Sequence, residues 1–190
     1  MIGQPPMTSE SNKNLLEVML KEYEKLKDEQ TQRLGFRDNM LYVGLVVIGG
    51  IVSFAMSDAE KNGALLLVPW VCLILGWTYL VNDEKISSIG RYVRTKLDQR
   101  ISQAIELPDL TLFGWEVEHR SDKYRTQRKL VQLLVDETAF CLSGIGSVCF
   151  YLVINKPPFS VILICSIEVI LLLGMGVEFW RYADLKKGRS

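Results

Sequence analysis

The sequence predicts an all-α membrane protein: a four-span transmembrane helical bundle made of two hairpins, with cytoplasmic amphipathic helices. The 190 residues carry 22 basic and 22 acidic side chains, but these charges are concentrated in three blocks. Four long apolar runs lie between the blocks, and Lys and Arg are divided very unequally among the segments that connect them. This pattern excludes a disordered chain, a disulfide-rich secreted module and a simple nucleic-acid binder.

The four apolar runs are long enough to cross a bilayer. They cover residues 40–56, 63–81, 138–154 and 159–179. At ~1.5 Å per residue, even the shortest run spans about 26 Å, close to the ~30 Å thickness of the hydrocarbon core. The runs are apolar on all sides and lack the polar stripe of a soluble helix. We expect Pro69 to kink the second run.

The connecting segments predict the topology. Residues 57–62 and 155–158 are too short to hold a domain, so the runs pair into two hairpins. Twenty Lys and Arg residues lie on the side of the termini and the central segment, and two lie in the hairpin turns. This asymmetry indicates that both termini are cytoplasmic. We expect a multi-pass protein of the bacterial inner (plasma) membrane.

The pattern divides the chain into six segments. We expect a disordered N-terminus (1–11), a cytoplasmic helix (12–38), a first transmembrane hairpin (39–81), a cytoplasmic helical segment (82–137), a second transmembrane hairpin (138–179) and a cytoplasmic tail (180–190).

Both cytoplasmic segments contain an amphipathic helix. In the first, an apolar stripe from Leu16 to Leu26 ends at Gln30. It predicts a helix that packs on the protein's own cytoplasmic part or forms a short coiled coil between subunits. In the second, an apolar stripe runs from Ile86 to Ile105, and the opposite face of the helix carries several Arg and Lys residues. That helix either lies on anionic inner-leaflet lipids or packs on the first one.

Glu168 is the main candidate for an ion or proton site. It lies in the middle of the fourth apolar run, where an ionisable side chain costs roughly 2.5–3.5 kcal/mol to insert. None of the four runs contains a Lys, Arg or His to neutralise it, so we expect a protonated side chain. Its expected hydrogen-bond partners are the hydroxyls of Ser166, Ser143, Ser147 and Tyr79. The alternative is a structural hydrogen bond between helices.

Two further groups of residues stand out. Small residues predict close helix packing in the second hairpin: Ala139, Ser143, Gly146, Ser147 and Gly174. Charged residues gather at the cytoplasmic ends of the runs, where ion pairs are expected by default and a cation vestibule is the alternative. These boundary charges are Arg37, Asp38, Asp83, Glu84, Lys85, Asp136, Glu137, Glu178 and Arg181.

Four strings carry a family resemblance. They are EYEKLK-x-EQ at residues 22–30, GFRDN at 35–39, GWTYLVNDEK at 76–85 and FGWE at 113–116. Together they resemble a family of small integral membrane proteins common in actinobacteria and cyanobacteria, and the resemblance implies no particular activity. The layout is also loosely similar to SLATT-type membrane effectors of nucleotide-signalled defence systems, which usually have one hairpin.

The sequence does not predict an enzyme, because it has no phosphate loop, nucleophile elbow or redox CxxC motif. We expect no cofactor and no metal, since the single histidine, His119, rarely suffices for zinc. The expected partners are the lipid bilayer, with its anionic inner-leaflet lipids, and further copies of the chain. We expect an oligomeric channel or membrane effector gated through the cytoplasmic helices, with Glu168 facing the axis. The alternatives are a scaffold that recruits a soluble cytoplasmic partner and a small proton-coupled transporter.

Overall fold

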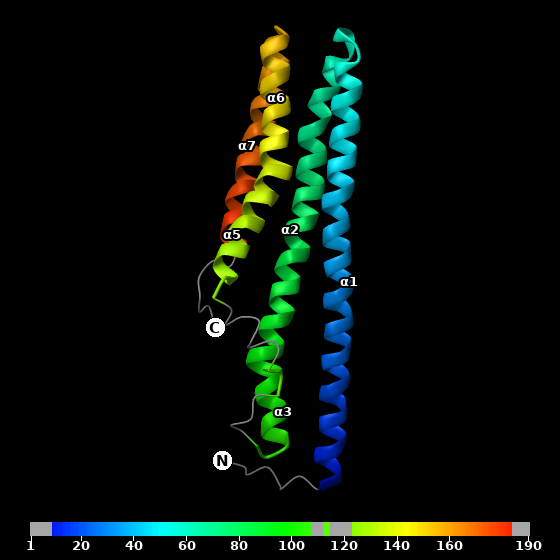
Figure 1. Ribbon diagram of the computed structural model, residues 1–190, viewed down its shortest axis with the longest axis vertical. Helices are drawn as coiled ribbons and strands as arrows, with labels where there is room; N and C mark the ends of the chain where they lie inside the picture. The colour runs from blue at the N-terminus through cyan, green and yellow to red at the C-terminus, as the bar shows by residue number, and fades with distance from the viewer. Residues whose placement is uncertain (1–8, 108–111, 115–122, 184–190) are drawn as a thin grey trace. The chain divides into compact units, whose positions relative to one another are not determined.

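The computed structural model describes residues 9–107, 112–114 and 123–183, and all regular elements in this part are helical (Figure 1). The first elements are α1 (Ser9–Met56), the 3₁₀ helix η1 (Ala59–Leu67) and α2 (Val68–Tyr92). The later elements are the π-helical η2 (Val93–Leu97), α3 (Asp98–Ala104), α5 (Arg125–Asp136), the π-helical η3 (Glu137–Leu142), α6 (Ser143–Ile154) and α7 (Phe159–Tyr182).

Four helical stretches are long and apolar enough to cross a membrane. They lie within Asn12–Met56, Ala59–Ala104, Arg125–Ile154 and Phe159–Tyr182. The prediction of an all-helical chain with four candidate spans is confirmed. Much of their apolar surface is not covered by the chain itself, as expected of helices that face lipid.

The first helix is longer than the sequence pattern indicated. A single α1 contains both the amphipathic stretch and the first apolar run, and it begins at Ser9. The expected disorder is therefore wrong for residues 9–11, while residues 1–8 lie outside the described part. The helix continues because no proline falls between Ser9 and Met56. Gly35 does not interrupt it, and no atom lies within 4 Å of a Cβ added at this position.

The second α-helix begins later than its apolar run. After α1, the Asp58 side chain accepts a hydrogen bond from the backbone N–H of Glu60, and the chain enters η1. The α-helix starts only at Val68, so Pro69 lies in its first turn. Proline is tolerated there because the first-turn N–H groups have no partner within the helix. Pro69 therefore costs no hydrogen bond within α2, and a kink at this position stays a prediction.

The chain divides into two compact units, and the first draws on residues 1–33 and 85–125. Its core is formed by Val93, Leu97 and Ile101, all buried. Side chains of α1 pack against this core: Leu16, Met19, Tyr23 and Leu26. The two amphipathic stripes therefore pack on each other, which was one of the alternatives for the basic helix.

Polar and aromatic contacts add to this first unit. The Gln30 side-chain amide donates to the backbone oxygen of Ile86 at 3.1 Å. The ring of Tyr23 stacks on Phe113, with ring centroids 4.3 Å apart. The Asp98 carboxylate accepts the backbone N–H groups of residues 112 and 113, at 3.0 and 3.2 Å, which anchors the Phe113 segment to α3.

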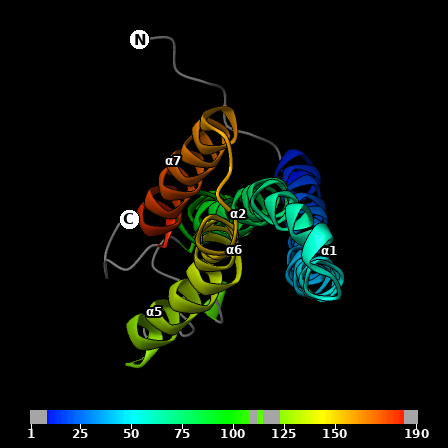
Figure 2. The same cartoon turned by 90° about the horizontal axis from the view of Figure 1, so that it is seen from above.

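The second unit draws on residues 34–84 and 126–189 and contains the four apolar runs. Within it, α2 lies between α1 on one side and α6 with α7 on the other (Figure 2). A buried cluster joins α2, η3 and α7, including Tyr79, Phe140, Met175 and Phe179. Gly76 makes room for this packing, because an added Cβ there would lie 2.9 Å from the Met175 sulfur.

Candidate functional site

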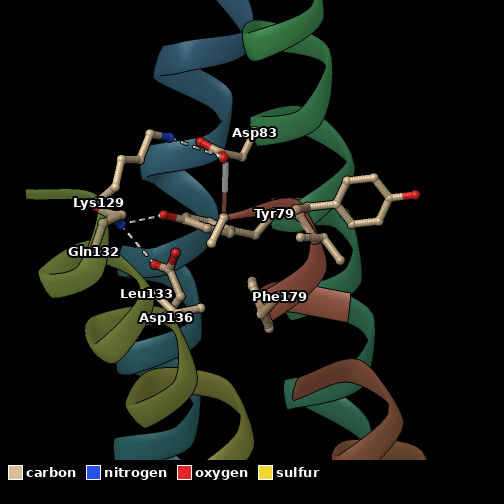
Figure 3. A pocket seen from close by; sticks show the side chains of 10 residues that line it. Tyr79, Asp83, Lys129, Gln132, Leu133, Asp136 and Phe179 are labelled. Carbon is tan, nitrogen blue, oxygen red and sulfur yellow. Dashed lines mark hydrogen bonds and ion pairs between the residues drawn. The ribbon is translucent and has the colours of Figure 1, made fainter. Parts of the chain in front are cut away.

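A network of charged and polar side chains lies in the second unit, next to the ends of the apolar runs (Figure 3). Arg37 of α1 donates from Nη1 to Oδ1 of Asp83 on α2 at 2.7 Å. Its Nε and Nη2 donate to Oδ1 of Asp38 at 3.0 and 2.8 Å. The Arg37 guanidinium also lies over the ring of Tyr79, 5.7 Å from its centroid. Arg37 therefore links α1 to α2 through a charge and an aromatic face.

The same network reaches α5 through Gln132. The Gln132 side-chain amide donates to the Tyr79 hydroxyl at 2.7 Å and to Oδ1 of Asp136 at 2.8 Å. Lys129, one turn earlier, lies 3.8 Å from Asp83. We call Arg37, Tyr79, Asp83, Lys129, Gln132 and Asp136 the boundary network. Because Tyr79 and Asp136 are buried, these hydrogen bonds satisfy polar groups that would otherwise destabilise the bundle.

A small cavity lies beside the boundary network. Its walls come from α2, α5 and the end of α7, and Figure 3 shows Tyr79, Asp83, Gln132 and Asp136 around it. The cavity measures about 20 Å³. Such a volume holds roughly one water molecule and is far below the ~300–1,000 Å³ of a small-molecule pocket. In this state of the second unit, the cavity is therefore neither an organic ligand site nor a permeation pathway.

The other boundary charges are more scattered. Glu178 accepts a hydrogen bond from Arg181 at 2.6 Å, and the Arg181 side chain is 66% exposed. Lys85 is exposed and belongs to the first unit, whereas Glu84 is half-buried in the second. Ion pairing, the default expectation, therefore holds for Arg37, Asp38, Asp83, Glu178 and Arg181.

Glu137 occupies a distinct position next to α7. It begins the π-helical η3, and its carboxylate oxygens lie 3.0 and 3.4 Å from where a Cβ on Gly176 would be. The Cys141 thiol is within hydrogen-bonding reach of the same carboxylate. Gly176 therefore allows the Glu137 side chain to fit between η3 and α7.

Outside the apolar runs, a polar contact connects the two amphipathic stripes of the first unit. The Tyr92 hydroxyl donates to the Glu22 carboxylate at 2.6 Å. This hydrogen bond to an anion favours the protonated phenol and raises the pKa of Tyr92.

Glu168 lies on the buried face of α7. It shares this face with Cys165, Leu172, Met175 and Phe179, at spacings of three and four residues. Its side chain is 1% exposed within the single chain. Glu168 is therefore enclosed by its own chain in this structure, and the expectation that it faces the axis of an oligomer stays a prediction.

The partner of Glu168 differs from those expected. Ser143, Ser147 and Ser166 donate instead to backbone oxygens of their own helices, at 2.8 to 2.9 Å. Serine commonly does so within helices because a carbonyl in the preceding turn is in reach. The hydrogen-bond donor to Glu168 is the Trp70 side chain, and Oε2 accepts no hydrogen bond from any described residue.

The small residues of the second hairpin pack less closely than predicted. Ala139 and Ser147 are buried, but Ser143 is only half-buried. Gly146 and Gly174 are exposed, and no atom lies within 4 Å of an added Cβ at either position. The close approach is at Gly144 instead, where an added Cβ would lie 2.7 Å from Cδ1 of Leu172. Rotation of the helix about its axis decides which of two neighbouring glycines faces the bundle.

The sequence did not identify three residues of the boundary network and of the Glu168 environment: Lys129, Gln132 and Trp70. Lys129, Gln132 and Asp136 are spaced by three and four, which places them on one helical face. That signal was present in the sequence. No comparable signal pairs Trp70 with Glu168, since they are 98 positions apart on different helices. His119 lies outside the described residues.

Comparison of the chain with protein-family models, curated proteins and solved structures found no match. The roles of the boundary network and of Glu168 are therefore inferred from their own geometry.

Proposed function

We propose that the chain forms an oligomeric membrane channel or membrane effector that is gated through its cytoplasmic helices. The observation that carries this proposal is the continuity of α1 and α2. The first contains a whole apolar run and the second contains most of one, and each also contains a stretch of the first unit. The boundary network joins these same two helices to α5. A ligand or protein that binds the first unit and moves α1 or α2 would thus strain the contacts of the boundary network, because the same two helices form that network.

The topology that we propose is two transmembrane hairpins with both termini in the cytoplasm of a bacterial cell. It is supported by the twenty Lys and Arg residues of the termini and the central segment against two in the turns. The boundary network would then lie at the cytoplasmic surface of the inner membrane. Anionic inner-leaflet lipids would meet the basic residues that flank it.

Gating would require several copies of the chain and a change in the boundary network. The cavity of about 20 Å³ in the second unit is too narrow for hydrated ions, so a conduction pathway would have to form between subunits. Loss of the Arg37–Asp83 contact would release α1 from α2 at the membrane boundary. The closed state is therefore the state in which Arg37 is paired.

Ion flux from liposomes tests this proposal. Purified protein is reconstituted, and flux is compared among the wild type, Arg37→Met, Asp83→Asn and Arg181→Met. Arg37→Met and Asp83→Asn should raise the flux because they break the network. Arg181→Met should not, because Arg181 forms an exposed pair with Glu178 of its own helix. Equal flux in all four proteins, or no flux in any of them, would overturn the proposal.

The same preparations address the alternatives and the topology. A protein that conducts no ions but co-purifies with a soluble cytoplasmic partner would indicate a scaffold. Flux of a single solute that requires a pH gradient would indicate a transporter. A reporter fused after Ser190 should be active only in the cytoplasm. Activity outside the cytoplasm would contradict the proposed orientation.

A further inference from the structure

The surroundings of the Glu168 carboxyl group indicate a role that is independent of gating. Its carboxyl group is almost fully enclosed by the second unit, in the middle of the most hydrophobic candidate span. A carboxylate in such surroundings is unfavourable unless a cation or several hydrogen-bond donors compensate for the lost hydration.

The neighbours of Glu168 do not supply that compensation. Trp70 donates a neutral hydrogen bond, and Oε2 has no partner among the described residues. The titratable group that interacts with Glu168 is the Cys165 thiol, three positions earlier on α7. From α2, the group that interacts with Glu168 is Trp70, which is neutral. No described Lys or Arg acts on Glu168.

We propose that Glu168 is a proton-binding site within the membrane, occupied at neutral pH, with Trp70 as the residue that positions its carboxyl group. In the protonated state, one oxygen accepts the Trp70 N–H and the other carries the proton. The proton is therefore on the side of the carboxyl group that no described residue holds. An oxygen that no described residue contacts favours a proton that can exchange over one that is fixed by a structural hydrogen bond.

Infrared spectroscopy of the protein in nanodiscs measures this proton directly. At neutral pH, the wild type should show the carbonyl band of a protonated carboxylic acid, and Glu168→Gln should lack it. Glu178→Gln is the matched control on the same helix, and it should keep the band because Glu178 is paired with Arg181. Transfer of the wild type into heavy water should shift the band within the time of a dialysis.

A second variant tests the positioning role without removing the acid. Trp70→Phe removes the donated N–H and should shift the carbonyl band to higher frequency. Trp77→Phe, an exposed residue of the same helix, should leave the band unchanged. Absence of a carboxylic acid band at neutral pH would show that Glu168 is ionised and would overturn the proposal. A band that heavy water never shifts would overturn it in favour of a sealed structural hydrogen bond.

The outcome is separate from that of the gating proposal. The infrared band reports the protonation of one side chain, whether or not the protein conducts ions. Conversely, flux that responds to Arg37→Met requires no proton on Glu168.

Discussion

Replacing Arg37 by Met should weaken the bundle measurably, because methionine keeps most of the aliphatic stem and removes the guanidinium. The largest loss is the hydrogen bond from Arg37 to Asp83, with a donor–acceptor distance of 2.7 Å. Hydrogen bonds to charged groups contribute about 1.5–3 kcal/mol. The contact with the Tyr79 ring adds roughly 0.5–1 kcal/mol.

The burial of the pair sets the size of the effect. The side chains of Arg37 and Asp83 are 17% and 18% exposed, so the pair is more desolvated than a surface ion pair, which is worth about 0–1 kcal/mol. After the substitution, Asp83 keeps Lys129 at 3.8 Å, so it is not left without a cation. We therefore expect a loss of about 2–3 kcal/mol, below the ~3–5 kcal/mol measured when fully buried pairs are broken.

The assay is unfolding by sodium dodecyl sulfate in mixed micelles, with Arg37→Met, Asp83→Asn and the double variant forming a cycle. If the two residues stabilise the bundle through each other, the double variant should lose less than the sum of the single losses. Arg181→Met, with its exposed partner, should lose no more than about 0.5 kcal/mol. Strict additivity in the cycle, or equal losses for Arg37→Met and Arg181→Met, would refute the reasoning.

Three other substitutions test the packing of each unit. Gly144→Val should destabilise the second unit by about 1–3 kcal/mol through overpacking, whereas Gly146→Val should be almost neutral in the same micelle titration because its site is open. Gln132→Leu leaves two buried oxygens without their shared donor, so we expect a loss of about 1–3 kcal/mol and faster hydrogen exchange in α5. Tyr23→Ala removes the stacked aromatic pair of the first unit and should accelerate proteolysis there, while Leu20→Ala, at an exposed site, should not. Equal behaviour of either matched pair would contradict the packing described above.

The spans were predictable because membrane crossing depends on local composition. A run of apolar residues such as 138–154 is unfavourable in water regardless of what it packs against, so the sequence identifies it without the fold. The position of Glu168 near the middle of the membrane was predictable in the same way, because it lies in the middle of residues 159–179. Helix boundaries were less accurate: α1 begins at Ser9 and α2 at Val68 because helix ends depend on capping and proline placement more than on hydrophobicity.

The sequence by itself determined the helical class, the four candidate spans and the identity of the one acid in mid-span. Only the tertiary structure decided which side chains meet: Arg37 with Asp83, Gln132 with Tyr79, and Trp70 with Glu168. The physical reason is that hydrophobic burial is nearly non-directional, so a run of apolar residues specifies a span but not its rotation. Polar contacts require atoms within about 3 Å of each other. Those distances depend on how each helix is turned and shifted against its neighbours.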